Sequence, residues 1–237
     1  MANPYFQFKK FTLFHDKCAM KIGTDGVLLG AWANIANTKI ILDVGTGTGL
    51  IAIMLAQRGK AMIDAIEINE AACMQARENI SGCPWASRIR LINASFQEYA
   101  KDCNKKYDLI VSNPPFYTNQ YKPAETTRSV ARHDDSLSLK ETIFFAEQIL
   151  SHKGILSVII PVESMKDFTV YLSHVNLFVI RVLQVIPSPG KPVRRVLIEA
   201  GRNKTDTETD SLTIDTGRRH DYTHEYKLLT KDFYLAF

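Results

Sequence analysis

The segment "DVGTGTG", from Asp43 to Gly49, gives the clearest indication of the fold class of this chain. It follows a short apolar run, "KIILDV", and precedes "GLIAIMLAQRG", a segment with helical spacing that stops at Gly59. Glycines at alternate positions permit a tight turn and let a ligand approach the backbone closely. The N–H groups of such a turn and of the helix after it form a positively biased cradle. The stretch therefore predicts a strand, a turn and a helix with a ligand site at the turn.

Strands and helices alternate along the chain on both sides of this turn. The strands are expected at residues 39–44, 61–67, 88–94, 107–112, 155–160, 177–186 and 192–200, and the core helices at residues 49–59, 69–80 and 138–154. This alternation favours a parallel sheet covered by helices on both faces. No helical segment separates the last two strands, so we expect them to form an antiparallel hairpin at the edge of the sheet.

The flanks of this core have patterns of their own. We expect a single domain over residues 1–237, with a cap segment at 1–38, a catalytic core at 39–201 and an extension at 202–237. A helix is expected within the cap segment at 24–35, with a cap at Thr24 or Asp25. The extension starts with "RNKTDTETD", which favours a solvated loop, and ends with a basic, aromatic tail that is compatible with a last helix.

Composition limits the class of protein. Hydrophobic residues make up 46% of the 237 residues and charged residues 23%, so a sizeable core is expected rather than disorder. No apolar run approaches the roughly 20 residues that span a bilayer, and the first residues do not read as a signal peptide. We therefore expect a cytoplasmic protein with no membrane partner. The four cysteines form no C-x-x-C pair and suit no metal site, and the net charge of +4 permits a polyanionic partner without requiring one.

An acidic residue ends the second expected strand and narrows the choice of ligand. Glu67 follows the glycine-rich turn by 18 residues, the place where an acid accepts hydrogen bonds from ribose hydroxyls in open α/β sheets. The spacing of Gly45, Gly47 and Gly49 differs from the dinucleotide fingerprint, and Asp43 would repel a pyrophosphate. A ligand with a ribose and an ammonium group, such as S-adenosylmethionine, suits both acids. The pattern resembles that of the Class I methyltransferases.

A second motif follows the fourth expected strand. Asn113-Pro114-Pro115-Phe116 lies at the carboxyl end of that strand, beside the expected cofactor site. Two prolines stiffen the loop and leave its carbonyls free, Asn113 adds an acceptor, and Phe116 offers a flat face. Acceptors and a ring suit a planar amine, whose nitrogen would be positioned for attack without a strong base. The tetrapeptide matches the [DNS]-P-P-[FYW] motif of amino-methyltransferases.

The cap segment and the region after the motif extend the resemblance to one family. "FHDKCAMKIGTDGVLLGAW" at 14–32 and "ARHDDSLSL" at 131–139, together with the motif, are similar to the bacterial tRNA1(Val) (adenine-37 N6)-methyltransferases. This resemblance implies an α/β, Rossmann-like fold with a seven-stranded, mostly parallel sheet and an antiparallel C-terminal hairpin. It also implies S-adenosylmethionine as cofactor and tRNA as partner.

The resemblance assigns roles to individual residues. The catalytic residues would be Asn113, Pro114, Pro115 and Phe116. The cofactor would be bound by Lys21, Gly23, Thr24, Asp25, Asp43, Gly45, Gly47, Gly49, Glu67, Ile68, Ala94, Ser95 and Asn113. The RNA would be contacted by Tyr117, Arg128, Arg132, His133, Lys191, Arg194 and Arg195. Ser95 departs from the pattern, because many Class I enzymes carry an acid there to read the cofactor's adenine.

Other functions share parts of this pattern. Protein glutamine-N5 methyltransferases use the same loop on an amide, but mostly carry Tyr as its fourth residue and a larger N-terminal domain. DNA adenine methylation would call for an insertion that recognises bases, which is not visible here. A non-catalytic RNA-binding or scaffold module could keep the fold, although an intact Asp43, Glu67 and Asn113 argue against that. We expect the enzyme to act as a monomer.

Overall fold

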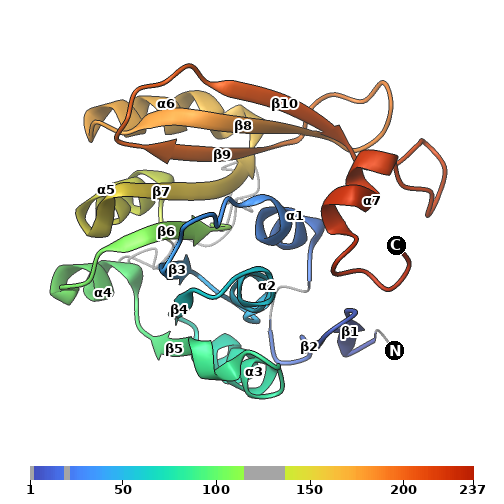
Figure 1. Ribbon diagram of the computed structural model, residues 1–237, viewed down its shortest axis with the longest axis horizontal. Coiled ribbons are helices and arrows are strands. Elements are labelled where there is room, and N and C mark those ends of the chain that lie inside the picture. The colour runs from blue at the N-terminus through green and yellow to red at the C-terminus, as the bar shows by residue number, and fades with distance from the viewer. Residues whose placement is uncertain (1–2, 19–21, 115–136) are drawn as a thin grey trace, which may run out of the picture.

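The computed structural model describes residues 3–18, 22–114 and 137–237, and in these ranges one large sheet organises the molecule (Figure 1). Its eight strands lie in the order β10-β8-β9-β7-β6-β3-β4-β5. The strands are β3 (Ile40–Val44), β4 (Met62–Glu67), β5 (Ile89–Asn93), β6 (Tyr107–Ser112), β7 (Leu150–Pro161), β8 (Phe178–Ile186), β9 (Arg195–Gly201) and β10 (Glu208–Thr213). β9 pairs antiparallel with both β7 and β8, and the other pairings in this sheet are parallel.

Helices cover both faces of the sheet. They are α1 (Thr24–Trp32), α2 (Leu50–Arg58), α3 (Glu70–Ser81), α4 (Phe96–Asp102), α5 (Leu139–Ile149), α6 (Met165–His174) and α7 (His224–Thr230), with short 3₁₀ helices at Ala86–Arg88 and Val162–Ser164. One apolar cluster joins α1, α2, α3 and α7 to one face, and a second joins α4, α5 and α6 to the other. Successive strand residues point to opposite faces, so Ile41 enters the first cluster and Leu42 the second.

Local sequence signals account for the core helices. The Asn69 side chain accepts a hydrogen bond from the Ala72 amide and caps α3. Ser138 and Glu141 form a reciprocal capping box at the start of α5. α1 begins differently from the expectation, because its N-cap is Gly23 and no side chain caps it. Both Thr24 and Asp25 lie inside its first turn.

The expected fold class is confirmed, with one correction to the strand count. β3 to β9 are the seven expected strands, but β10 adds an eighth parallel to β8, so the β8–β9 hairpin does not form the edge of the sheet. β10 occupies part of the stretch expected to be a solvated loop. Leu212 is its one buried residue, so the stretch has no apolar alternation that would have predicted a strand.

The two ends of the described chain meet beside α7. A small hairpin of β1 (Tyr5–Gln7) and β2 (Thr12–Phe14) precedes α1, and Phe8 bridges to Tyr234. The rings of Phe8 and Tyr234 stack with centroids 5.9 Å apart. The basic, aromatic tail therefore packs back as a last helix and closes one end of the first apolar cluster.

Candidate cofactor and substrate site

The glycine-rich turn adopts the conformation that its glycines permit. Gly45, Gly47 and Gly49 have φ of 70°, 56° and 86°, a region that residues with a Cβ rarely enter. The amide of Gly49 donates to the carbonyl of Thr46 over 2.9 Å, and that of Thr46 donates to the carbonyl of Ile66 over 2.9 Å. The turn is thus fastened to the end of β4. At Gly45 and Gly47 an added Cβ would meet nothing within 4 Å, so backbone conformation rather than space demands glycine there.

Asp43 lies beneath this turn and is fully buried. Its Oδ2 accepts hydrogen bonds from the Thr46 hydroxyl over 2.6 Å and from the Ala52 amide over 3.1 Å. Its Oδ1 has no hydrogen-bond partner among the described residues. Burial raises the pKa of this carboxyl to about 7, although the Thr46 and Ala52 hydrogen bonds oppose the shift. Asp43 therefore holds the turn from below.

Glu67 joins the ends of two elements. Its Oε2 accepts from the Gly47 amide over 2.8 Å, and its Oε1 accepts from the Asn69 amide over 2.8 Å. The residue is 8% exposed and lines the pocket at the end of the sheet. Each oxygen keeps a second lone pair, so the carboxylate can accept two more hydrogen bonds from a bound ligand. Its orientation is fixed by the backbone before any ligand arrives.

The pocket at the carboxyl ends of β3, β4, β5 and β6 gathers most of the expected site. Its lining includes eight of the residues expected to bind cofactor or substrate: Gly45, Gly47, Glu67, Ile68, Ala94, Ser95, Asn113 and Pro114. Asp43 and Gly49 do not line the pocket. Asp43 accepts a hydrogen bond from Thr46 of the turn, and Gly49 ends the turn with a positive φ. Gly23, Thr24 and Asp25 also lie outside the pocket lining, at the start of α1.

Ser95 lines this pocket and also has a structural role that we did not expect. It is the N-cap of α4, where its hydroxyl accepts from the Glu98 amide over 3.1 Å and donates to the Glu98 carboxylate over 2.8 Å. This capping box uses the hydroxyl's one donor and one of its two lone pairs, so Ser95 keeps a single lone pair for a ligand. The structural reason for a serine here is the start of a helix.

The first half of the tetrapeptide lies on the opposite wall of the pocket. The Ser112 hydroxyl donates to the Val44 carbonyl over 3.0 Å and ties the end of β6 to the end of β3. Asn113 and Pro114 follow at once and line the pocket with Gly45 and Gly47. Pro115 and Phe116 lie outside the described residues, as do Lys21, Tyr117, Arg128, Arg132 and His133.

Two residues assigned to different ligands contact one another. Arg195 Nε lies 2.8 Å from Asp25 Oδ2, so an expected RNA contact pairs with an expected cofactor contact. The pair joins the start of β9 to the first turn of α1. Lys191 and Arg194 are exposed in the loop between β8 and β9, on the carboxyl side of β8.

Comparison with known proteins identifies the family. A family model, the methyltransferase small domain, matches residues 20–162. A tRNA1(Val) (adenine(37)-N6)-methyltransferase from Parabacteroides distasonis is 48% identical over 236 residues, which cover 99% of each chain. A protein of the same name from Trichodesmium erythraeum is 46% identical over 240 residues, which cover 100% of each chain. The chain belongs to the tRNA1(Val) (adenine(37)-N6)-methyltransferase family.

Solved structures agree on the fold of this family member. A predicted O-methyltransferase from Agrobacterium tumefaciens superposes with a TM-score of 0.68 at 17% identity, over 88% of this chain and 96% of that one. A ribosomal protein L11 methylase from Lactobacillus delbrueckii superposes with a TM-score of 0.58 at 19% identity, over 81% and 84% of the two chains. At these identities the likeness concerns the fold alone.

The pocket fits S-adenosylmethionine, the methyl donor of Class I methyltransferases. Glu67 offers free lone pairs for ribose hydroxyls, and the turn leaves open space above Gly45 and Gly47. Ile68, Phe96 and Leu137 add an apolar wall that suits a flat base. Phe96, Gln97 and Leu137 were not among the site residues expected from the sequence. The start of α4 would have been the signal, since "SFQE" reads as a capping box.

Proposed function

We propose that this chain methylates the exocyclic N6 of adenine 37 in a tRNA for valine, with S-adenosylmethionine as methyl donor. The observation that carries the proposal is the shared pocket of Asn113 and Pro114 with Gly45, Gly47 and Glu67. The groups that would accept hydrogen bonds from an amine and the turn that would bind a nucleoside therefore line the same pocket. The full-length relatives named for this reaction support the choice of base and of RNA.

The chain's own residues would act mainly by positioning. The cofactor supplies an electrophilic methyl group on a sulfonium. The Asn113 side-chain oxygen and the Pro114 carbonyl would accept hydrogen bonds from the two N6 hydrogens and direct the nitrogen lone pair at that methyl group. Attack by N6 on this methyl group would release the sulfur as a thioether, and the methylated ammonium would lose its proton to water. Phe116, outside the described residues, would stack on the extruded base.

The proposal is tested by methyl transfer from labelled cofactor to tRNA from cells that lack the gene. We expect label in N6-methyladenosine after digestion to nucleosides, and none with tRNA that already carries the modification. Label in a protein or in DNA, with none in tRNA, would refute the assignment. Failure to bind the cofactor in calorimetry would favour a scaffold.

Two further expectations belong to this proposal. We propose that the enzyme acts as a monomer in the cytoplasm, where its RNA substrate is found. Across the described ranges, no helix is long and apolar enough to cross a membrane. Light scattering after size-exclusion chromatography measures the mass in solution, and a mass of two chains would contradict the monomer.

A further inference from the structure

Two exposed basic loops lie next to each other at the end of β8 and β10. The first loop, residues 187–194, carries Lys191 and Arg194, and the second, residues 214–222, carries Arg218, Arg219 and His220. All five residues are exposed. We call these five residues the C-terminal basic surface. The second loop was not among the RNA contacts expected from the sequence.

The eighth strand brings the two loops together. Because β10 runs parallel to β8, both strands deliver their following loops to one edge of the sheet. The Ile214 amide donates to the Ile186 carbonyl over 2.9 Å, and the Asp215 amide donates to the Pro187 carbonyl over 3.1 Å. Farther out, a Cβ added to Gly217 would lie 3.9 Å from Pro189 Cδ. The two loops therefore lie side by side.

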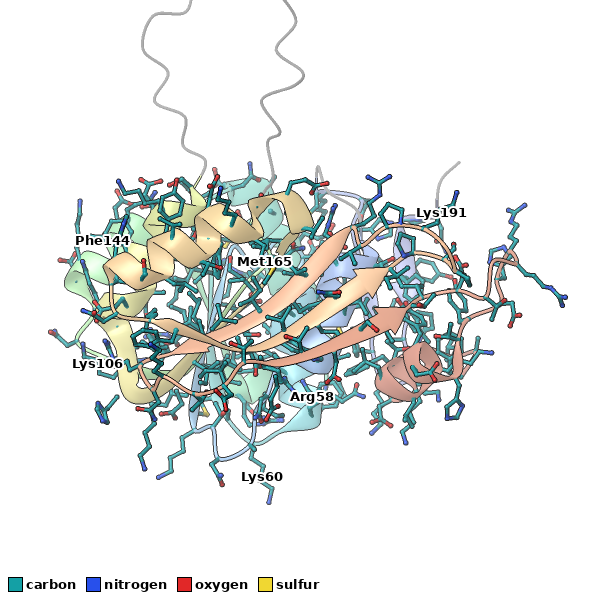
Figure 2. The ribbon with its side chains drawn as sticks, turned by 90° about the horizontal axis from the view of Figure 1, so that it is seen from above. Arg58, Lys60, Lys106, Phe144, Met165 and Lys191 are labelled. Carbon is teal, nitrogen blue, oxygen red and sulfur yellow. The ribbon has the colours of Figure 1, made fainter. Side chains whose placement is uncertain are left out.

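This edge is the one that carries the cofactor pocket. The Val162 amide, just past the carboxyl end of β7, donates to the Arg194 carbonyl over 3.3 Å. β7 pairs with β6, whose carboxyl end leads into Asn113. Figure 2 shows Lys191 at the edge of the molecule opposite to Lys60, which precedes β4 on the amino side of the sheet. The basic surface and the pocket thus share one rim.

Among the described residues, the acids of the second loop form no ion pair with its arginines, although the Thr216 hydrogen bond and, less strongly, the charge of Arg218 lower the pKa of Asp221. Asp215 Oδ1 accepts from the Gly217 amide over 2.8 Å, and Asp221 Oδ2 accepts from the Thr216 hydroxyl over 2.7 Å. Asp221 also lies 3.7 Å from Lys227 Nζ, on α7. These acids hold the loop's shape. Within the described part of the chain, no ion pair involves the lysine and arginines of this surface, which are Lys191, Arg194, Arg218 and Arg219. The neighbouring Arg195 pairs with Asp25.

We propose that the C-terminal basic surface binds backbone phosphates of the RNA substrate, beside the nucleotide whose base enters the pocket. This inference rests on the proposed function and adds the place where the rest of the RNA is held. Exposed guanidinium groups bind phosphate oxygens through paired hydrogen bonds, and such contacts position a nucleic acid without reading its sequence. β10 places three of the five residues of this surface, Arg218, Arg219 and His220, at this edge of the sheet.

The test compares two double variants. Arg218→Ala with Arg219→Ala removes two cations from the surface, and Lys39→Ala with Lys60→Ala removes two exposed cations from the opposite edge. Binding of unmodified tRNA is followed by fluorescence anisotropy at several salt concentrations. We expect the arginine variant to weaken binding about tenfold and to reduce the slope of log K against log salt by about one to two, since each phosphate contact releases counterions. The lysine variant should match the wild type.

Further measurements separate this role from a structural one. Calorimetry should give the same affinity for S-adenosylmethionine in the wild type and in the Arg218→Ala, Arg219→Ala variant. In steady-state methylation, the variant should keep the wild-type kcat and have a higher KM for tRNA. Arg218→Lys with Arg219→Lys should restore most of the binding, because charge is retained. If the arginine variant loses cofactor binding through misfolding, Lys191→Ala with Arg194→Ala tests the first loop and should raise KM for tRNA in the same way.

The outcomes distinguish the two proposals. Wild-type enzyme that methylates tRNA, together with alanine variants whose KM and salt slope are unchanged, overturns the basic surface and leaves the function intact. An equal loss in the Lys39 and Lys60 variant would also overturn it, because binding would then follow net charge alone. Wild-type enzyme that neither binds nor methylates tRNA removes both proposals.

Discussion

Apart from β9, the strands of the large sheet end at one edge, and the two halves of this edge differ in where they place ionisable groups. The first half lies at the ends of β3 and β4, and the second lies past the ends of β8 and β10. At the ends of β3 and β4, Asp43 and Glu67 have buried carboxyl groups that accept hydrogen bonds from the backbone. Past the end of β10, Arg218 and Arg219 are exposed cations without an ion pair among the described residues. The first arrangement gives a small ligand a preset geometry. The second suits a large, flexible polyanion, whose contacts can form at solvent-exposed groups and are screened by salt.

The largest expected effect concerns the buried carboxyl group of Asp43, which makes the stability of the protein depend on pH. The pKa of Asp43 is raised to about 7 in the folded protein, so the neutral form is favoured by folding. The corresponding stability is present below pH 4 and is lost as pH rises from about 4 to 7. The shift corresponds to a free energy on the order of 4 kcal/mol. Asp43→Asn does not titrate there and removes this pH dependence.

Denaturant unfolding of the cofactor-free protein at pH 4 and pH 8 measures this effect. The stability of wild type minus that of Asp43→Asn should fall with rising pH. The Glu70→Gln variant, at an exposed position at the start of α3, should show no such trend relative to wild type. A wild-type advantage that stays constant over this range would mean that the carboxylate is ionised in the fold at no cost.

The second effect concerns Asn113, at the boundary between the two halves. Asn113→Ala removes the proposed acceptor of the N6 amine, and we expect kcat to fall about 10²- to 10³-fold, the usual loss for a preorganised polar group at the reacting atoms. Single-turnover methyl transfer measures the loss, and the affinities for cofactor and tRNA should change little. Asn104→Ala, at an exposed asparagine outside this pocket, is the matched control. Normal transfer by the Asn113 variant would remove the residue from the mechanism.

The smallest effect is expected at Glu67. In Glu67→Gln, an NH₂ group replaces one oxygen and faces either the Gly47 or the Asn69 amide, so one hydrogen bond is lost and two donors oppose each other. We expect about tenfold weaker binding of S-adenosylmethionine, which corresponds to the 1.5 kcal/mol at the lower end for hydrogen bonds to charged groups. Calorimetry measures it at 50 and 200 mM salt. The ratio of the wild-type and Glu67→Gln affinities should be the same at both salt concentrations. A ratio that changes strongly with salt would contradict the expectation, because the contact would then behave like an exposed phosphate contact.

The core of the fold was predictable because its signals are local. Glycines in the turn, the Asn69 cap and the box of Ser138 and Glu141 specify their elements within a few residues. The spacing from the turn to Glu67 predicted that they lie at one site, and Gly45, Gly47 and Glu67 line the same pocket. The reason is that parallel strands deliver their carboxyl ends to one edge, so order along the chain indicates proximity in space.

The parts that were not predicted either have weak local signals or depend on contacts between residues that are distant in sequence. α4 and α6 were not expected, since α4 has seven residues and α6 carries β-branched and aromatic residues that weaken its helical signal. The pairing of Asp25 with Arg195 spans 170 residues, and no local pattern reports it. β10 is a strand because β8 offers it a free ladder, not because its own residues alternate.

β10 also has a consequence for solubility. It is the outermost strand of the sheet, and four of its six residues are exposed, among them Glu208 and Asp210. Without it, the edge would be β8, a nine-residue strand that starts with Phe178-Val-Ile180. A long apolar edge is a template for pairing with another chain, whereas a short acidic one repels it. The strand that completes the sheet therefore also protects it from edge-to-edge aggregation.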